Sequence, residues 1–361
     1  MPRTAHAPSP VKKTRSAGNG LAIPATIRPM EARLVDALPR DQGWQFEPKW
    51  DGFRCLAFRD GPDVDLRAKS GKSLARYFPE VTHALAQSGP RQFVVDGELA
   101  VPVDGALSFD ALQMRLHPAE SRVLRLASET PAILIAFDVL VAGGGKNVID
   151  RPLTERRSHL EELHEAIGRK GGLRLSPFTR NLATAEKWLA DSGGAVDGVI
   201  AKRLDGAYVP GERAMLKVKR LRTADCVVGG FRYGRDSRDV ASLLLGLYNA
   251  KGRLDHVGFT VVSGRRDRRA LTRRLEALME PPGFTGDAPG GPSRWSTERS
   301  AEWQPLRPEL VVEVRYDHVT GARFRHGTTF VRWRPDKAPE QCTFEQIAQV
   351  PDRSRLLRRT L

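Results

Sequence analysis

The sequence has few cysteines and no long apolar run. Its three cysteines, Cys55, Cys226 and Cys342, are far apart and form no C-x-x-C pair, so neither a disulfide framework nor a cysteine-rich zinc site is expected. No apolar stretch approaches the roughly 20 residues of a membrane-spanning helix. The N-terminal residues lack the apolar segment of a secretory signal, and the histidines lack paired zinc-ligand spacing. These absences favour a protein of the reducing cytoplasm that does not enter a membrane.

Basic residues, by contrast, are abundant. The 361 residues include 58 Lys and Arg against 43 Asp and Glu, a formal net charge of +15. Such an excess attracts polyanions and favours phosphate backbones through counterion release, although basic composition also occurs in proteins that are merely soluble. The chain is longer than one hydrophobic core usually organises, so two domains are expected. Charge therefore suggests a nucleic-acid partner without establishing one.

Strand and helix patterns alternate irregularly in the first two-thirds of the chain, which is typical of an α+β fold. Bulky and polar residues alternate over 45–58 and 64–69 around a turn at 59–62, and this pattern predicts a β-hairpin. Apolar residues at helical spacing predict helices over 73–87, from a Thr154 cap to Gly171, and over 183–191. Further strands are expected at 92–101 and 198–202.

Closely spaced strand patterns follow in the last third, at 226–233, 242–248, 256–263, 310–316 and 322–333. Five short strands with one inserted helix predict a small Greek-key barrel of the OB type. The inserted helix, 265–279, holds six arginines and one aspartate and is either a solvated face or a phosphate-binding surface. A Gly- and Pro-rich stretch at 275–305 predicts a long surface loop. The expected organisation is a basic disordered arm at 1–20 and domains at 21–221 and 222–361.

One motif carries clear chemical content, K-x-D-G-x-R over residues 49–54. A match of this kind arises by chance in about one such sequence in a hundred, so it needs companions. They follow in order: Asp96-Gly97-Glu98, Phe137-Asp138, D-G-V-I-A-K over 197–202, K-V-K over 217–219 and R-P-D-K over 334–337. The ordered set resembles the motifs of the covalent nucleotidyltransferases, the superfamily of ATP-dependent DNA ligases, RNA ligases and mRNA capping enzymes.

Stretches such as EPKWDGFR, RYFPE, LRTADCVV and RWRPDKAP are similar to compact bacterial ligases of the end-joining type, with the stand-alone ligase C proteins as the nearest subgroup. The resemblance implies an ATP-grasp-like adenylation (nucleotidyltransferase) domain followed by an OB-fold β-barrel. It also implies ATP-dependent sealing of 5′-phosphate/3′-hydroxyl breaks in DNA repair, through a covalent lysyl-AMP and a DNA-adenylate. An RNA ligase, a capping-type transferase and a catalytically silent DNA-binding relative remain alternatives.

Lys49 is the expected nucleophile, because a lysine amine can carry AMP between ATP and DNA as a phosphoramidate. Only about one free lysine in 2,500 is uncharged at pH 7. Neighbouring cations and partial burial favour the neutral amine. Four cations are available for this purpose and for neutralising the triphosphate: Arg54, Lys202, Lys217 and Lys219. By resemblance, Lys217 and Lys219 contact the α-phosphate and complete the catalytic set.

The resemblance assigns the other site residues by their matching positions. Glu47 is expected beside the adenine amino group, Arg54 and Glu98 on the ribose, and Phe137 stacked on adenine. In the terminal motif, which relatives carry on the OB domain, Asp336 and its neighbours orient the leaving pyrophosphate. The ATP-binding set is completed by Trp50, Lys69, Lys202, Arg334 and Lys337.

A divalent metal, Mg²⁺ or Mn²⁺, is expected to supplement the cations, because phosphoryl transfer depends on charge neutralisation. Its candidate ligands are Asp197, which stands where many relatives have Glu, and Glu98. Lys69 replaces an arginine of the relatives, and a point charge loses bidentate phosphate recognition. Without the resemblance, Phe137 would be assigned to the core and Asp96 to a turn.

The remaining expectations concern partners and location. Nicked or broken double-stranded DNA is the expected substrate, and end-joining or base-excision repair proteins are the protein partners to consider. We expect a monomer in the bacterial cytoplasm, associated with the nucleoid. The preferred lesion, the tolerance for 3′ ribonucleotides and the role of the arginine-rich segment 265–274 stay open.

Overall fold

The computed structural model describes residues 20–168, 172–192, 196–235, 237–262, 265–290 and 302–348. The arm expected at 1–20 lies outside these residues except for Gly20. The chain divides into two compact units. One comprises the described residues up to Ala185 together with Ile200–Lys217, and the other comprises those of Glu186–Val199 and from Val218 onward. Each unit has a hydrophobic core of its own.

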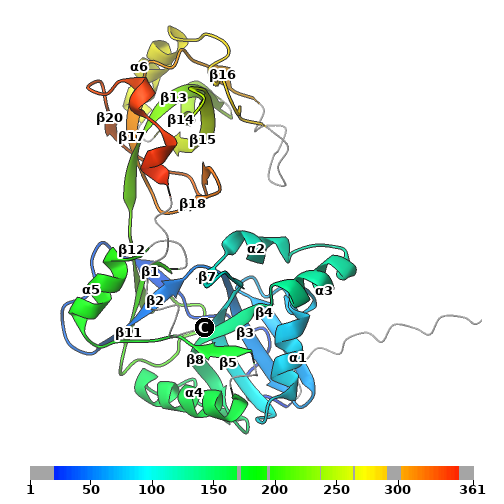
Figure 1. Ribbon diagram of the computed structural model, residues 1–361. Coiled ribbons are helices and arrows are strands. Elements are labelled where there is room, and N and C mark those ends of the chain that lie inside the picture. The colour runs from blue at the N-terminus through cyan, green and yellow to red at the C-terminus, as the bar shows by residue number, and fades with distance from the viewer. Residues whose placement is uncertain are drawn as a thin grey trace, which may run out of the picture. The chain divides into compact units, whose positions relative to one another are not determined.

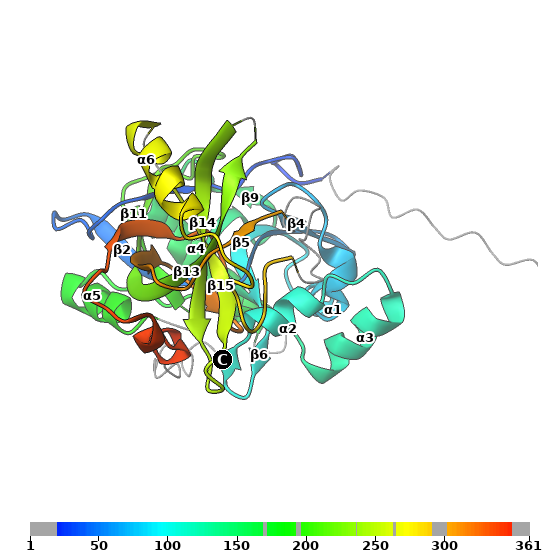
Figure 2. The same ribbon diagram turned by 90° about the horizontal axis from the view of Figure 1, so that it is seen from above.

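The first unit is built on two sheets (Figures 1 and 2). The larger has the strand order β10-β8-β5-β3-β4, with β9 paired to β8. Its strands are β3 (Phe53–Asp60), β4 (Asp63–Ala68), β5 (Gln92–Ala100), β8 (Ile133–Ala142), β9 (Lys146–Asn147) and β10 (Leu173–Leu175). The smaller sheet has the order β1-β12-β11-β2. Its strands are β1 (Ala32–Leu34), β2 (Trp44–Trp50), β11 (Val196–Arg203) and β12 (Met215–Lys219), and the boundary between the units cuts through the last two.

Both faces of the larger sheet are covered, since alternate residues of a strand point to opposite sides. On β3, Cys55 and Ala57 face one core, and Leu56 and Phe58 face another. Residues of three helices, among them Leu85, Leu112 and Leu163, help to fill the first of these cores. The helices of this part of the chain are η1 (Ala75–Tyr77), α1 (Pro79–Gln87), α2 (Phe109–Met114), α3 (Glu120–Glu129), α4 (Leu153–Ile167) and α5 (Leu182–Ala190), and a small hairpin, β6 (Pro102–Val103) and β7 (Ala106–Leu107), precedes α2.

The single strand predicted over 45–58 is wrong. The structure has two strands there, β2 and β3, and they belong to different sheets. The chain changes sheets at Asp51-Gly52, where a Cβ on Gly52 would collide with the carbonyl oxygen of Leu99. Only glycine allows this close approach of two backbones. The K-x-D-G-x-R motif therefore spans the junction of the two sheets.

Two helix boundaries were also predicted wrongly. The helix expected over 73–87 becomes a 3₁₀ turn followed by α1, because Pro79 disfavours the helical conformation in the residue before it. Helix α4 begins at Leu153 after Pro152, without a side-chain cap from Thr154. It ends at Gly168, whose φ of 71° suits glycine. The helix expected over 183–191 is confirmed as α5.

The second unit contains an antiparallel sheet in the order β15-β14-β13-β17-β20, with β16 paired to β13. An isolated bridge joins Thr260 on the edge strand β15 to Thr328, the residue before the other edge strand β20. No ladder pairs β15 with β20, so the described strands do not form a continuous closed barrel. The strands are β13 (Arg222–Gly234), β14 (Ser237–Tyr248), β15 (Leu254–Val261), β16 (Gln304–Pro305), β17 (Val311–Tyr316) and β20 (Thr329–Trp333). The arginine-rich helix is α6 (Arg265–Glu276), and η3 (Pro339–Gln341) and η4 (Phe344–Ile347) follow β20.

Two predictions for this unit need correction. The strand expected over 322–333 is interrupted and forms β19 (Arg323–Phe324), which pairs with β18 (Val319–Thr320), and then β20. Within the interruption, the amide of Thr328 donates to the carbonyl of Phe259 instead of continuing a ladder. The described parts of the stretch 275–305, residues 275–290 and 302–305, are more than a surface loop, because Leu275 and Phe284 are buried and Trp303 packs on the same core. The rest of the predicted loop lies outside the described residues.

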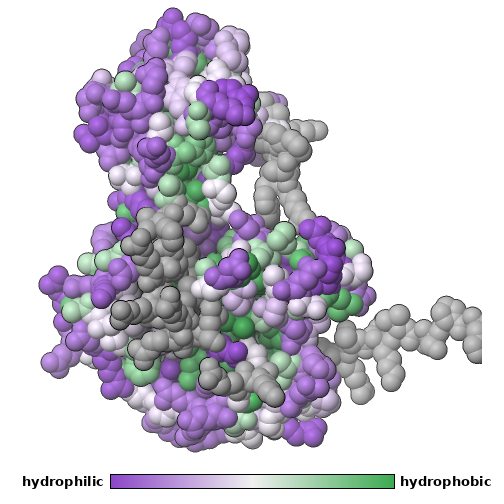
Figure 3. All heavy atoms as spheres, in the orientation of Figure 1, coloured by the Kyte–Doolittle hydropathy of each residue, from purple (hydrophilic) through white to green (hydrophobic). Residues whose placement is uncertain are grey.

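The face in Figure 3 is largely hydrophilic over both units, with small apolar patches. No helix in the part of the chain that the structure describes is long and apolar enough to cross a bilayer.

Candidate active site

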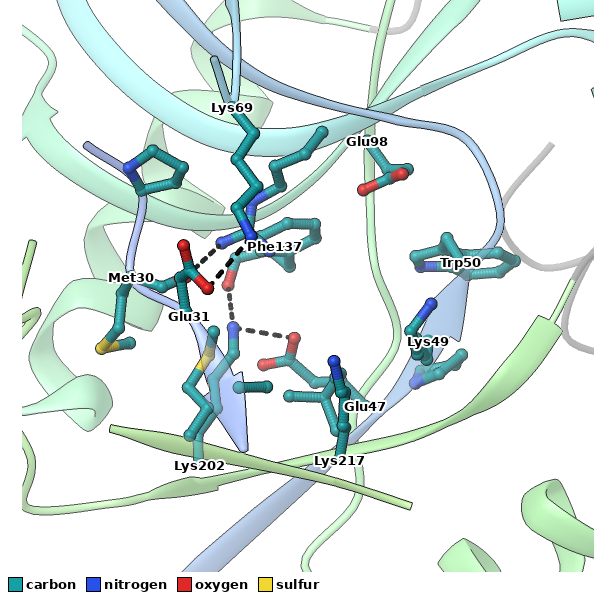
Figure 4. Close-up of a pocket in the computed structure, with 16 residues that line it drawn as sticks. Met30, Glu31, Glu47, Lys49, Trp50, Lys69, Glu98, Phe137, Lys202 and Lys217 are labelled. Atoms are coloured by element: carbon teal, nitrogen blue, oxygen red, sulfur yellow. Dashed lines mark hydrogen bonds and ion pairs between the residues drawn. The ribbon is translucent and has the colours of Figure 1, made fainter. Parts of the chain in front are cut away.

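A cavity of about 260 Å³ lies in the first unit between strands of its two sheets. This volume is close to the lower limit for small-molecule sites and suits a ligand of nucleoside size. Figure 4 shows Lys49 and Lys217 on one side of the cavity and Lys69 on another. Nine residues predicted from the sequence line it: Glu47, Lys49, Trp50, Arg54, Lys69, Glu98, Phe137, Lys202 and Lys217.

Two glycines of the sequence motifs bring these strands together. Gly52 lies between β2, which carries Lys49, and β3, which carries Arg54. Gly198 has a φ of 152°, and a Cβ there would collide with the carbonyl oxygen of Val218 on β12. The glycine of D-G-V-I-A-K therefore lets β11 approach the strand that carries Lys217. Both glycines serve the backbone geometry of the site rather than its chemistry.

Glu47 and Lys202 form a buried ion pair in the cavity. The Nζ of Lys202 lies 2.9 Å from Oε2 of Glu47 and donates to the carbonyl of Phe137 at 3.0 Å. Oε1 of Glu47 accepts from Nε2 of Gln45 at 2.8 Å. Both carboxylate oxygens thus have partners, and the side chain is fixed. A buried carboxylate held in this way can accept further hydrogen bonds from an N–H group of a ligand.

Arg54 is held by a carboxylate that the sequence did not single out. Asp96 is fully buried on β5 rather than in a turn, so the assignment made without the resemblance is wrong. Its Oδ1 and Oδ2 each lie 2.6 Å from nitrogens of Arg54, and Tyr208 donates its hydroxyl to Oδ2 at 2.6 Å. An acid inside the apolar strand 92–100 was the available signal, because such a charge needs a buried partner.

The ring of Phe137 is buried and has cations close to it. The Cζ of Arg54 lies 4.5 Å and the Nζ of Lys202 lies 4.8 Å from the ring centroid, both within cation–π range. The next residue, Asp138, is buried against Arg156, with 2.8 Å between Oδ1 and Nε. Burial alone would raise the pKa of Asp138, but the charges of Arg156 and Lys202 outweigh burial and lower it. Phe137 is thus both a core residue and part of the cavity wall.

Glu98 differs from these paired acids. Burial raises the pKa of Glu98 to about 7, although the charges of Arg54 and Lys49 oppose the shift. A carboxyl in this state gains from any further cation, which makes Glu98 a suitable oxygen ligand for a divalent metal. At the cavity edge, Lys69 pairs with Glu31 at 3.0 Å and remains exposed. Trp50 is buried, and its indole N–H donates to the hydroxyl of Ser176 at 2.9 Å.

Four predicted residues do not line this cavity and belong to the second unit: Asp197, Lys219, Arg334 and Lys337. The Nζ of Lys219 lies 3.1 Å from Asp197 and 2.7 Å from Asp317. Burial would raise the pKa of Asp317, but hydrogen bonds from Lys219 and His326 outweigh burial and lower it to about 2. A metal at Asp197 would compete with Lys219. Within the described residues, no group of three or more His, Cys, Asp or Glu side chains is arranged to hold a metal.

The comparisons with known proteins agree with this arrangement of motifs. The model of the ATP dependent DNA ligase domain matches residues 29–219, and that of the ATP dependent DNA ligase C terminal region matches residues 236–337. The chain is 44% identical over 350 residues to DNA ligase C2 of Mycolicibacterium smegmatis, covering 92% of this chain and 98% of the relative. The chain belongs to the ATP-dependent DNA ligases.

Other relatives of this ligase support the same conclusion. DNA ligase C of Mycobacterium tuberculosis is 43% identical over 343 residues, covering 91% of this chain and 95% of that protein. Among solved structures, a protein from a study of Lig E DNA ligases has a TM-score of 0.54 at 18% identity, over 84% of this chain and 99% of that one. This structure bears on the fold alone. The expected fold, a nucleotidyltransferase domain followed by an OB-fold domain, is confirmed.

Proposed function

We propose that Lys49 carries AMP covalently while this ligase joins 5′-phosphate and 3′-hydroxyl ends in DNA. The amine attacks the α-phosphorus of ATP, so that a P–N bond forms and pyrophosphate leaves. The 5′-phosphate of the broken strand then attacks the same phosphorus, which frees the lysine and leaves an AMP–phosphate anhydride on the DNA. The 3′-hydroxyl attacks the 5′-phosphate, the strand is sealed and AMP leaves. The placement of Lys49 beside Lys217 and Arg54 in one nucleoside-sized cavity supports this sequence of steps.

The buried Glu47–Lys202 pair supports adenine as the base. A carboxylate accepts hydrogen bonds, so Glu47 suits the amino group of adenine and disfavours the carbonyl oxygen that guanine has at the same ring position. Lys202, which guanine would need as a donor, is already occupied by Glu47 and by the carbonyl of Phe137. We therefore propose ATP as the nucleotide rather than the GTP of capping enzymes.

Mg²⁺ or Mn²⁺ is proposed as the metal that assists this ligase. Glu98 supports its presence, because burial leaves this carboxyl with a raised pKa that a cation would lower. Asp197 is the second proposed ligand, once Lys219 no longer occupies its carboxylate. When bound, the metal would neutralise charge on the phosphates. The Arg54 guanidinium, held by Asp96, and the amines of Lys69 and Lys217 provide the cations of the protein itself.

Nicked or broken double-stranded DNA is the proposed substrate, since the family consists of DNA ligases and the chain is strongly basic. The monomeric state, the nucleoid location and the end-joining or base-excision partners remain predictions.

The test is incubation of purified protein with labelled ATP and Mg²⁺ or Mn²⁺, followed by mass spectrometry of its peptides and by sealing of a nicked duplex. We expect AMP on position 49 and loss of both activities in Lys49→Ala. Lys72→Ala is the matched control, because this exposed lysine lies in a turn outside the cavity lining. Adenylylation that persists in Lys49→Ala would refute the nucleophile. GTP as the productive donor, or sealing of RNA nicks alone, would refute the proposed substrates.

A further inference from the structure

We infer that Asp225, on β13, is a positioning residue that holds Arg334 and Lys337 in the orientation needed for attack on ATP. The inference rests on the proposed function and on the role that the family resemblance implies for these two cations, which is to orient the leaving pyrophosphate. Asp225 lies in the stretch LRTADCVV, more than a hundred residues before the R-P-D-K turn. The fold nevertheless brings this carboxylate against both cations.

The contacts are short and involve both oxygens of Asp225. Nη1 of Arg334 donates to Oδ1 and to Oδ2 at 2.9 Å each. Nζ of Lys337 donates to Oδ2 at 2.7 Å. One carboxylate therefore fixes two cations of the same turn relative to each other. Charge-assisted hydrogen bonds of this length are directional, so they fix orientation as well as position.

The backbone of Asp225 is itself fixed. Its amide donates to Oε1 of Gln346 at 3.0 Å, and its carbonyl accepts from Nε2 of the same side chain at 3.0 Å. Asp225 also lies inside the ladder of β13 and β17, opposite Glu313. The Asp225 side chain is only 11% exposed. A rigid, poorly hydrated carboxylate makes a better support than a mobile surface side chain.

Arg334 has a second carboxylate partner on its other edge. Nε and Nη2 donate to Asp336 at 2.9 and 2.8 Å, and the Asp336 side chain is 61% exposed. An exposed ion pair of this kind contributes little and is readily exchanged. An incoming phosphate can therefore take the place of Asp336 on the outer edge of the guanidinium while Asp225 still holds the inner edge. The two carboxylates thus divide the guanidinium into a fixed edge and an exchangeable edge.

The position of Asp225 in the sheet is unfavourable without these cations. Asp225 and Glu313 are direct neighbours on adjacent strands, and like charges placed opposite each other destabilise a sheet. Each acid has its own arginine: Arg334 for Asp225 and Arg332 for Glu313. Glu313 on β17 and Arg332 on β20 therefore form a second ion pair in the same sheet. Among the described residues, no ion pair or hydrogen bond joins Glu313 to the R-P-D-K turn, so Glu313 provides the control.

The experiment compares Asp225→Asn with Glu313→Gln in the full chain. Asparagine keeps the size of the side chain but removes its charge. Self-adenylylation is measured against ATP concentration, and sealing is measured separately on a nicked duplex that already carries AMP on its 5′-phosphate. We expect Asp225→Asn to slow self-adenylylation at least tenfold while sealing of the pre-adenylylated nick stays within about twofold of wild type. Glu313→Gln should stay within twofold in both assays.

A purely structural role would lower both activities of Asp225→Asn in parallel and would overturn the inference. The inference would also be overturned if Asp225→Asn adenylylated itself like wild type. A double variant gives a stricter test. Asp225→Asn should slow self-adenylylation much less in an Arg334→Ala background than in the wild-type background. An equal slowing in both backgrounds would contradict action through Arg334. If wild-type protein took up no AMP on Lys49, the proposed function itself would fail, and this result is distinct from the others.

Discussion

The cavity of the first unit and a cluster in the second unit, formed by Asp197, Lys219, Asp317 and His326, contain acids whose pKa values shift in opposite directions. In the cavity, burial dominates at Glu98 and raises its pKa to about 7. In the cluster, burial also acts on Asp317, but direct contacts with Lys219 and His326 lower its pKa to about 2. The two acids differ in their hydrogen-bond donors. Donors contact the Asp317 carboxylate closely enough to outweigh the hydration that it loses on burial, whereas at Glu98 the loss of hydration dominates. The cavity therefore has a carboxyl that would gain from an additional cation, and the cluster has one that is already matched.

The largest expected effect concerns Asp96, an acid outside the cavity lining that, unlike Glu98, is fully paired through Arg54 and Tyr208. Asp96→Ala removes the partner of the Arg54 guanidinium and leaves Tyr208 without its acceptor. Breaking a buried pair in this way costs about 3–5 kcal/mol, which chemical denaturation would measure. The control is Asp205→Ala, whose pair with Arg203 is exposed, and this substitution should destabilise the protein far less. Equal losses of unfolding free energy in the two variants would show that burial does not make the Asp96 pair more stabilising than the Asp205 pair.

A smaller effect tests the raised pKa of Glu98. Its folded-state pKa, about 7, exceeds the usual 4.5, so its contribution to stability is fully present below pH 4.5 and is lost as pH rises through 7. Glu98→Gln cannot ionise. The variant should therefore gain roughly 1–3 kcal/mol relative to wild type between pH 4.5 and pH 8. Unfolding curves of both proteins across this range would measure the difference, and a constant difference would contradict the shift.

For Asp317 we expect a pH dependence of stability that is opposite in sign to that of Glu98. Its folded-state pKa is about 2 against the usual 3.8, so its contribution is present above pH 3.8 and is lost as pH falls through 2. Wild type should exceed Asp317→Asn in stability by roughly 1–2 kcal/mol at pH 6, and the difference should shrink on acidification toward pH 2. If the stability difference between wild type and Asp317→Asn grew on acidification, the proposed contrast between the pKa shifts of Glu98 and Asp317 would be wrong.

The smallest effect concerns Lys69, which is exposed and paired with Glu31. Lys69→Arg would introduce a planar guanidinium fork at this position, and bidentate phosphate contact should lower the KM for ATP about two- to fivefold. Lys72→Arg, in the same turn but outside the cavity lining, is the control. An unchanged KM in Lys69→Arg would indicate that Lys69 does not contact the nucleotide.

Site residues that belong to motifs in a fixed order along the chain were predictable from the sequence. The K-x-D-G-x-R motif, its companions and the family resemblance together identified nine residues that line one cavity. The acids that support them were not predictable, because the partners of Asp96 and Asp225 are brought close only by the fold. A single sequence offers no sign of such long-range pairs beyond a charge inside an apolar strand. The change of sheet at Gly52 was missed for a similar reason, since the carbonyl that excludes a side chain belongs to a distant strand.

The ion pair of Lys202 with Glu47 makes one end of the cavity electrostatically different from the other. Because this lysine is neutralised by its carboxylate and by the carbonyl of Phe137, its charge contributes little to attracting phosphates. The attraction must come from the other amines of the lining, those of Lys49, Lys69 and Lys217. A nucleotide entering in the reverse direction would place its anionic tail against a buried carboxylate, so the cavity favours one orientation of ATP before any reaction occurs.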